Sequence, residues 1–303
     1  MRLRPVILAV VLASPLVAEA QRGKYGGLVL QLPASARAMA LGDAYVATRD
    51  VESLFYNPAQ LVGGRTGAAA SVQRFGDAGE LGSLAGVTSL GSTAGVGVGV
   101  QFLGHDMGPG DYPLAPGSLA RDDLMRGWSV AATLAGTVVF RGVRWGLGTK
   151  YVADLVDERG DGGFLVDVGA AKEIGLVSLG IAAQNLGVDF NVQGGGDGRL
   201  PTRITAGVAS GGLPLGPFDV SLLASVAMRR DTRITPAGGA EFSWSPLDGI
   251  TGFGRFGVHR PQRDAESALS VGTGFTFDRI SVDYAFAGFE GPGSTHRLGL
   301  RIR

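Results

Sequence analysis

The sequence has no cysteine and, beyond its N-terminus, no long apolar run, and its acidic and basic residues are equal in number. Without cysteine, the 303-residue chain can form neither a disulfide framework nor a thiolate metal site or nucleophile. The 27 Lys and Arg residues against 27 Asp and Glu residues give no general electrostatic attraction to nucleic acid. No stretch of about 18 consecutive apolar residues predicts a transmembrane helix. The chain is instead rich in glycine, with 51 residues against a usual share of about 7%.

The first twenty residues have the pattern of a secretory signal peptide. Arg2 and Arg4 supply the positive start, residues 5–17 are almost wholly apolar, and Ala18-Glu19-Ala20 forms a small-residue cleavage site. The apolar run is shorter than the roughly 20 residues that a membrane-spanning helix needs. We therefore expect export from the cytoplasm and cleavage near Ala20.

After residue 65 the chain repeatedly alternates large apolar side chains with small or polar ones. In the run 280–287, isoleucine, valine, tyrosine and phenylalanine alternate with serine, aspartate and alanine. Successive side chains of a β-strand point to opposite faces, so such a run has one apolar face and one small, polar face. A tilted β-strand of about 9–11 residues crosses a bilayer. The chain has a dozen or more runs near this length, which predicts an all-β fold, a closed antiparallel transmembrane β-barrel.

Fourteen runs can be delimited, which makes fourteen the expected number of strands. Bacterial single-chain barrels have an even number of strands, so 12 and 16 are the alternatives. The runs are 66–74, 83–90, 94–103, 127–140, 143–154, 163–172, 176–185, 203–210, 218–229, 236–244, 250–259, 267–277, 280–288 and 295–302.

Long and short connections between these runs alternate along the chain. Counted from the first, the odd-numbered connections, such as 104–126, are mostly long, whereas even-numbered ones, such as 141–142, are mostly short. Outer-membrane barrels place their long loops outside the cell and their short turns on the periplasmic side. The sorting therefore favours a barrel over a soluble sandwich and predicts the outer membrane of a diderm (Gram-negative-type) bacterium as its location.

Charged residues recur on the small, polar face that would line the interior of the barrel. We expect them to pair across the lumen and to hold an internal segment rather than to catalyse a reaction. The expected lumen charges are Arg144, Lys150, Asp154, Asp167, Asp219, Glu241, Arg297 and Arg301.

The segment 33–61 has a different pattern from the strands. It is rich in alanine and has apolar residues at helical spacing in positions 38–45. Asp50 is suited to cap a short helical turn, and Asn57-Pro58 indicates where that turn ends. Because small side chains allow close packing, we expect this segment to fill a barrel with glycine-lined walls as a short helical plug. The expected domains are the signal peptide 1–20, the periplasmic and plug segment 21–65, and the transmembrane barrel 66–303.

The order of motifs along the chain resembles the PorV/PorQ family, within the wider group of FadL-type outer-membrane barrels. In that family a stretch G-A-R-A-x-G-M-G-G-A precedes Y-N-P-A-G-L. The residues that carry the resemblance are Ala36, Arg37, Ala38, Leu41 in place of methionine, Gly42, Ala44, Tyr56, Asn57, Pro58, Ala59 and Leu61. Two further pairs of stretches fit, 184–187 with 200–202 and 283–286 with 295–298.

The resemblance implies a non-enzymatic protein embedded in outer-membrane lipid. Its main implication is an accessory role in protein secretion or surface attachment of the type IX kind, with secreted client proteins or components of the secretion machine as partners. The alternative is a FadL-like channel for the uptake of hydrophobic small molecules. Neither function implies a cofactor or a nucleic-acid partner.

No motif in the sequence indicates catalysis or metal binding. Gly252-x-Gly254-x-x-Gly257 matches a dinucleotide fingerprint as text, but these residues keep the alternation of a strand instead of opening a helix. A Ser/His/Asp hydrolase would need a serine beside His259 or His296, and nothing in the sequence marks one. We therefore expect no catalytic, cofactor-binding or metal-binding residue.

Overall fold

The structure is a computed structural model that describes residues 27–63, 66–74, 79–107, 125–156, 159–192, 196–198, 200–230, 233–261, 266–289 and 294–303. The expected signal peptide and most of the 104–126 connection lie outside these residues and stay predictions.

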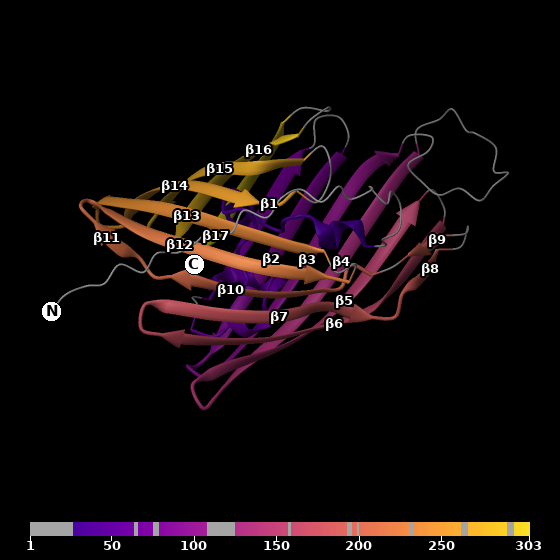
Figure 1. Ribbon diagram of the computed structural model, residues 1–303, viewed down its shortest axis with the longest axis horizontal. Coiled ribbons are helices and arrows are strands. Elements are labelled where there is room, and N and C mark those ends of the chain that lie inside the picture. The colour runs from indigo at the N-terminus through magenta and orange to yellow at the C-terminus, as the bar shows by residue number, and fades with distance from the viewer. Residues whose placement is uncertain are drawn as a thin grey trace.

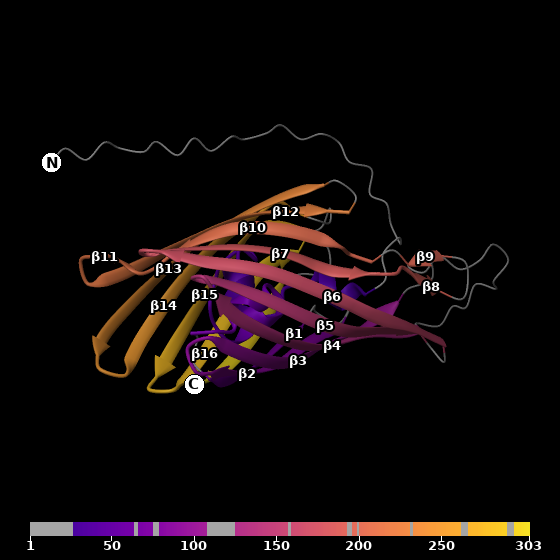
Figure 2. The ribbon, with the colours of Figure 1, turned by 90° about the horizontal axis from the view of Figure 1, so that it is seen from below.

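Fourteen strands in the described part of the chain close into one antiparallel barrel (Figures 1 and 2). They are β1 (Gly67–Arg74), β2 (Gly79–Leu90), β3 (Ala94–Met107), β4 (Met125–Phe140), β5 (Val143–Val156), β6 (Arg159–Ile174), β7 (Val177–Gly187), β10 (Arg203–Ser210), β12 (Phe218–Arg229), β13 (Ile234–Leu247), β14 (Ile250–His259), β15 (Glu266–Phe277), β16 (Ile280–Phe289) and β17 (Thr295–Ile302). Each strand pairs with the next in this order, and the barrel closes where β1 pairs with β17, with Ala70 opposite Leu300.

Three further short strands lie at the two ends of the barrel. β11 (Leu213–Leu215) pairs only with β12, whereas β8 (Phe190–Val192) and β9 (Gly196–Gly198) form a separate two-stranded ladder. Figures 1 and 2 show β11 at the opposite end from β8 and β9. We call these the short-turn end and the long-loop end of the barrel, respectively.

Tight turns connect strands at the short-turn end. Between β4 and β5, Arg141 and Gly142 both have positive φ, 52° and 73°. This is the backbone of a type I′ turn, whose twist matches that of the strands it joins. The two-residue connection is the one that the sequence predicts.

The outward face of the barrel is apolar, and the inward face is small or polar. On β3, Val98 is 58% exposed and points outward, whereas its neighbours Gly97 and Gly99 face Leu54 inside the barrel. On β17, outward-facing Leu300 alternates in the same way with inward-facing Arg301. A continuous exposed apolar face is unfavourable in water and is what the hydrocarbon core of a bilayer covers.

The N-terminal segment lies inside the barrel, where Figure 1 shows it in indigo. It contains four short helices within the described residues: η1 (Leu28–Gln31), α1 (Ala36–Ala40), η2 (Val51–Phe55) and η3 (Pro58–Gln60). No described helix has the length and hydropathy needed to span a membrane. We call residues 27–63 the plug; the boundaries 1–20, 21–65 and 66–303 stay predictions.

The predicted architecture is confirmed, with fourteen strands rather than 12 or 16. Some strands are longer than predicted: β6 begins at Arg159 instead of residue 163, and the connection before it is correspondingly shorter. The reason is that Gly160 and Gly162 keep the ladder with β5 although they carry no side chain that could show alternation.

Candidate functional site

The first helix of the plug is held by a cap and ended by its backbone. The Ser35 side chain accepts a hydrogen bond of 3.0 Å from the Ala38 amide at the start of α1. Gly42 and Asp43 have φ of 66° and 63°, in the left-handed region that an α-helix cannot contain. The helix therefore ends well before residue 45, although the spacing of apolar residues continues to that point.

The second part of the plug follows its predicted capping pattern. Asp50 Oδ1 accepts from the Ser53 amide and Ser53 Oγ accepts from the Asp50 amide, both at 3.0 Å. This reciprocal pair is a capping box at the start of η2. Asn57 caps η3 in turn, since its Oδ1 accepts from the Ala59 amide at 3.0 Å.

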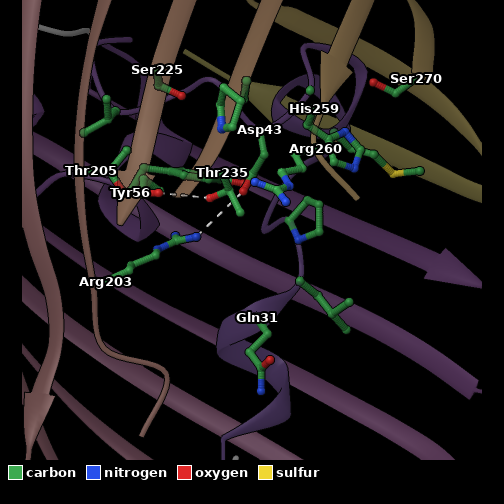
Figure 3. Close-up of a pocket in the computed structure, with 18 of the residues that line it drawn as sticks. Gln31, Asp43, Tyr56, Arg203, Thr205, Ser225, Thr235, His259, Arg260 and Ser270 are labelled. Atoms are coloured by element: carbon green, nitrogen blue, oxygen red, sulfur yellow. Dashed lines mark hydrogen bonds and ion pairs between the residues drawn. The ribbon is translucent and has the colours of Figure 1, made fainter. Parts of the chain in front are cut away.

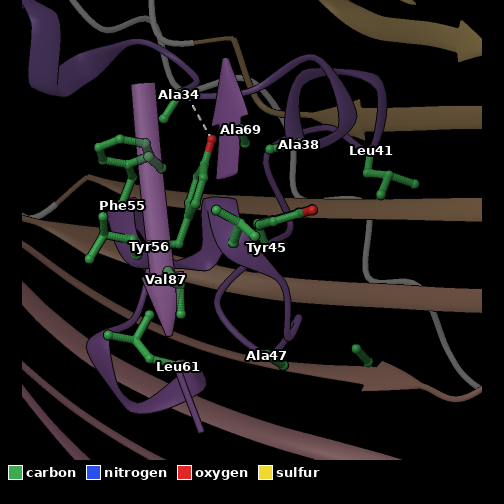
Figure 4. Close-up of a cluster of buried hydrophobic side chains, with 14 of the residues drawn as sticks. Ala34, Ala38, Leu41, Tyr45, Ala47, Phe55, Tyr56, Leu61, Ala69 and Val87 are labelled. Atoms are coloured by element: carbon green, nitrogen blue, oxygen red, sulfur yellow. Dashed lines mark hydrogen bonds between the residues drawn. The ribbon is translucent and has the colours of Figure 1, made fainter. Parts of the chain in front are cut away.

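Aromatic residues of the plug pack on each other at its centre (Figure 4). The rings of Tyr45 and Tyr56 are 5.0 Å apart, and the Tyr56 hydroxyl accepts a hydrogen bond of 2.8 Å from the Ala34 amide. Leu54 and Leu61 lie in the same buried cluster, with Ala69 and Val87 of the barrel wall. The plug therefore has a hydrophobic core that it shares with the barrel.

On one side the plug contacts the barrel through glycines. A Cβ at Gly146 of β5 would overlap the main chain at Pro58 and Ala59, and one at Gly169 of β6 would overlap the Asn57 side chain. Gly180 of β7 meets the plug main chain in the same way. We call Gly146, Gly169 and Gly180 the glycine wall. It confirms that the plug packs against glycine-lined strands.

On the other side, six charged side chains form a closed ring between the plug and β13, β14, β16 and β17. Successive N–O distances around it are Arg37–Glu241 2.8 Å, Glu241–Arg255 2.5 Å, Arg255–Asp283 2.6 Å, Asp283–Arg301 2.8 Å, Arg301–Asp50 3.5 Å and Asp50–Arg37 3.0 Å. The six side chains are at most 17% exposed. We call them the charge ring. Because signs alternate, every buried charge has two neighbours of opposite sign, which offsets its loss of hydration.

The sequence predicted part of this ring. Glu241 and Arg301 were expected as lumen charges and Arg37 as a motif residue, whereas the charge partners Arg255 and Asp283 were missed. The strand pattern could have found both, since each occupies a position between outward-facing side chains.

Arg297 of β17 anchors the beginning of the plug. Its guanidinium donates to the Pro33 and Ala34 carbonyls, to the latter at 2.6 Å, and to the Ser71 hydroxyl, also at 2.6 Å. It is fully buried, and no carboxylate lies within ion-pair distance of it in the described part of the chain. Arg297 thus holds the plug through main-chain oxygens, whose position does not depend on side-chain identity.

Two more of the expected lumen charges form a buried pair near the plug. Lys150 Nζ lies 2.7 Å from Asp167 Oδ2 and also donates to Asn185 Oδ1 at 2.9 Å. The side chain of Gln184, which lies beside Asp167, donates to the Phe55 carbonyl at 2.9 Å. This network connects β5, β6 and β7 with the plug.

The remaining lumen charges lie nearer the ends of the barrel. Arg144 donates to Gln60 of the plug at 3.0 Å, and Asp154 accepts from the Gly27 amide at 2.5 Å. Asp219 is exposed close to the short-turn end, and no ion pair joins it to another described residue.

The pKa values of two buried acids in the plug shift in opposite directions. Burial raises the pKa of Asp50, but Arg37, Arg301 and hydrogen bonds from Tyr45 and Ser53 outweigh it, so the pKa is lowered overall.

Burial raises the pKa of Glu52 to about 7, with Asp50 and Asp283 adding to the shift and Arg301 and Arg297 opposing it. Its nearest cation is the Arg301 Nε, at 3.8 Å, and Glu52 Oε2 has no hydrogen-bond partner in the described structure. Glu52 is therefore the weakly compensated acid beside the charge ring.

A cavity of about 80 Å³ lies between the plug and the walls of β10, β12, β13, β14 and β15. Figure 3 shows Arg203 directed toward Asp43, with which it forms an ion pair of 3.8 Å. Thr205, Ser225 and Ser270 also line this cavity. Hydroxyl and amide groups therefore face this cavity beside apolar side chains such as Met39 and Val46.

One polar cluster on the outer face corrects an expectation from the sequence. Ser294 Oγ lies 2.8 Å from His296 Nε2, and the Tyr284 hydroxyl lies 2.7 Å from His296 Nδ1, so a serine does lie beside this histidine. The third member is a phenol instead of a carboxylate, and the cluster does not line the cavity described above. The contacts orient the imidazole without forming a substrate site.

No protein-family model and no curated protein sequence matches the chain. Solved structures do: the toluene transporter TodX of Pseudomonas putida has a TM-score of 0.57 at 11% identity, over 93% of this chain and 98% of that one.

Two further structures are similar over comparable lengths. The toluene transporter TbuX of Ralstonia pickettii has a TM-score of 0.57 at 12% identity, over 90% of this chain and 98% of that one. A FadL homologue of Pseudomonas aeruginosa has a TM-score of 0.56 at 10% identity, over 89% of this chain and 98% of that one. At such identities the likeness shows the fold alone, and the specific resemblance to PorV/PorQ is not confirmed.

Proposed function

We propose that the protein is an outer-membrane channel for hydrophobic small molecules, in which the plug closes the lumen until it moves. The observation that carries the proposal is the combination of an apolar-faced, fourteen-stranded barrel with an internal plug, a fold shared almost end to end with the named transporters. The expected signal peptide and the apolar outward face support the outer membrane as its location.

Of the two functions expected from the sequence, this proposal favours the channel for hydrophobic small molecules over the accessory role in secretion. The named neighbours are transporters, which supports transport over both catalysis and the capture of secreted clients. The secretion role rested on the resemblance to PorV/PorQ, for which no family match was found.

Uptake of radiolabelled toluene tests the proposal directly. Proteoliposomes that contain the folded chain should take up toluene faster than empty liposomes of the same composition. Equal rates would reject transport of this class of molecule.

A disulfide can test whether the plug controls passage. A Cβ at Gly299 would lie 3.2 Å from the Ala36 Cβ, so a small outward shift brings the pair to the roughly 3.5–4.5 Å that a disulfide uses. The double variant Ala36→Cys/Gly299→Cys has no other cysteine to pair with. Oxidation should fix the plug to β17 and slow uptake, and reduction should restore it. Equal uptake rates of the oxidised and the reduced variant would show that solutes pass without displacement of this part of the plug.

A further inference from the structure

Two buried polar groups border the cavity beside the plug and have no hydrogen-bond partner in the described structure. They are Ser270 Oγ on β15 and Gln31 Nε2 on η1, on different walls of the same cavity. Ser270 is only 2% exposed. Burial of a hydroxyl or amide without a hydrogen bond is unfavourable, so such groups in a cavity are places where a polar guest gains hydrogen bonds.

The size of the cavity limits the guest. An apolar cavity of about 150 Å³ accommodates benzene, whereas this one measures about 80 Å³. It therefore has no room for an aromatic ring while the plug is in place, but it can hold a small polar group or a few water molecules.

The charges around the cavity favour an uncharged group. Asp43 and Arg203 neutralise each other across 3.8 Å. Arg260 is exposed, and its guanidinium donates to the Ile234 carbonyl. An anion would meet Asp43 and a cation would meet Arg203, whereas a neutral group that both donates and accepts hydrogen bonds avoids both penalties.

We infer that this cavity recognises the hydroxyl group of a small amphiphile, such as a phenol, whose apolar part stays outside it. The inference rests on the proposed function and specifies its preferred substrate class: a hydrophobic molecule with one hydroxyl, which should bind more tightly than a hydrocarbon of similar shape. Ser270 and Gln31 are its selective contacts, because a hydroxyl can form hydrogen bonds with them and a hydrocarbon cannot.

Two probes of nearly the same shape test this selectivity. 4-Methylphenol and p-xylene differ by a hydroxyl in place of a methyl group. Equilibrium dialysis against the full chain in lipid nanodiscs, with empty nanodiscs subtracted, should show about tenfold tighter binding of 4-methylphenol, the ratio expected for hydrogen bonds available to one probe alone. Equal affinities would overturn the inference.

Matched serine variants locate the contact. Ser270→Ala removes a hydroxyl that has no partner, so the barrel should fold, as heat-modifiability on a gel can verify. The preference for 4-methylphenol should fall to about threefold or less. Ser243→Ala, at a half-buried position of β13 outside the cavity lining, should keep the full preference. A preference that survives Ser270→Ala would place recognition elsewhere and overturn the assignment.

Parallel uptake of both probes separates this inference from the proposed function. Preferential binding without uptake of either probe would reject the channel and keep the hydroxyl site. Uptake of both probes without preferential binding would keep the channel and reject the hydroxyl site.

Discussion

The two sides of the plug contact the barrel by different physical means. Toward β13–β17 the plug is held by ion pairs of the charge ring and by Arg297, in addition to close contact of its main chain with Gly239 and Gly257. Toward β5–β7 its main chain lies directly on the glycine wall. Ion pairs in a dry interior add specificity of position more than net stability, because desolvation offsets the attraction. Close contact with glycine excludes every larger residue. Charge thus adds to close contact on the β13–β17 side of the plug, whereas close contact with glycine is the main constraint on the β5–β7 side.

Removal of one acid from the charge ring should have the largest effect on stability. Asp283→Asn leaves Arg255 and Arg301 without the carboxylate that lies between them, and breaking a buried pair costs about 3–5 kcal/mol. Urea unfolding from lipid vesicles should show this loss. Hydrogen exchange should rise first in residues 36–50, on the charged side of the plug.

The matched control for that variant is another aspartate of the barrel. Asp219→Asn changes an exposed group without a described ion pair and should alter the unfolding free energy by less than about 0.5 kcal/mol. Similar losses in both variants would show that the ring has no special part in stability.

The unfolding free energy should also depend on pH through Glu52, which lies beside the charge ring. Its pKa in the folded protein is about 7, against 4.5 for the ordinary value. Between these values the folded state keeps a proton that the unfolded state has released, so this group lowers stability as pH rises through that window. Glu52→Gln should remove the loss, which amounts to about 3 kcal/mol above pH 7, and should have little effect below pH 4.

The comparison that checks this prediction is the difference between variant and parent at each pH. Such a difference cancels the contribution of Asp50, whose lowered pKa makes it stabilising above its ordinary range and less so in acid. A difference that stays flat from pH 4 to pH 8 would mean that Glu52 titrates normally in the folded protein.

The glycine side can be tested with two residues of one strand. Gly146→Ala places a methyl group on the plug main chain and should cost about 1–3 kcal/mol, as overpacking does. Gly148→Ala meets its nearest atom at 3.4 Å, an ordinary contact, and should be neutral within about 0.5 kcal/mol. Hydrogen exchange in 51–60 should rise only in the first variant. Equal behaviour of the pair would mean that the plug does not rest on this wall.

The sequence predicted the barrel wall better than the contacts across its lumen. Alternation is a local property, so each strand and the inward position of Arg301 could be predicted without knowledge of any partner. Which charges meet depends on how the ring of strands closes and on where the plug lies, and these are global properties. Arg255 illustrates this: its run was recognised as a strand, but its pairing with both Glu241 and Asp283 follows only from the closed barrel.

The smallest effect is expected for an ion pair at the edge of the glycine side. Arg49 of the plug lies 2.9 Å from Glu173 of β6, and both side chains are partly exposed, 34% and 43%. Solvent screens such a pair, so Arg49→Ala should cost only about 0–1 kcal/mol, although its geometry is as short as that of the charge ring. Urea unfolding should show this small loss at low salt and a loss closer to zero at high salt. A loss near that of Asp283→Asn would mean that charge holds the plug on both sides, and that the contrast between a charged side and a glycine side is wrong.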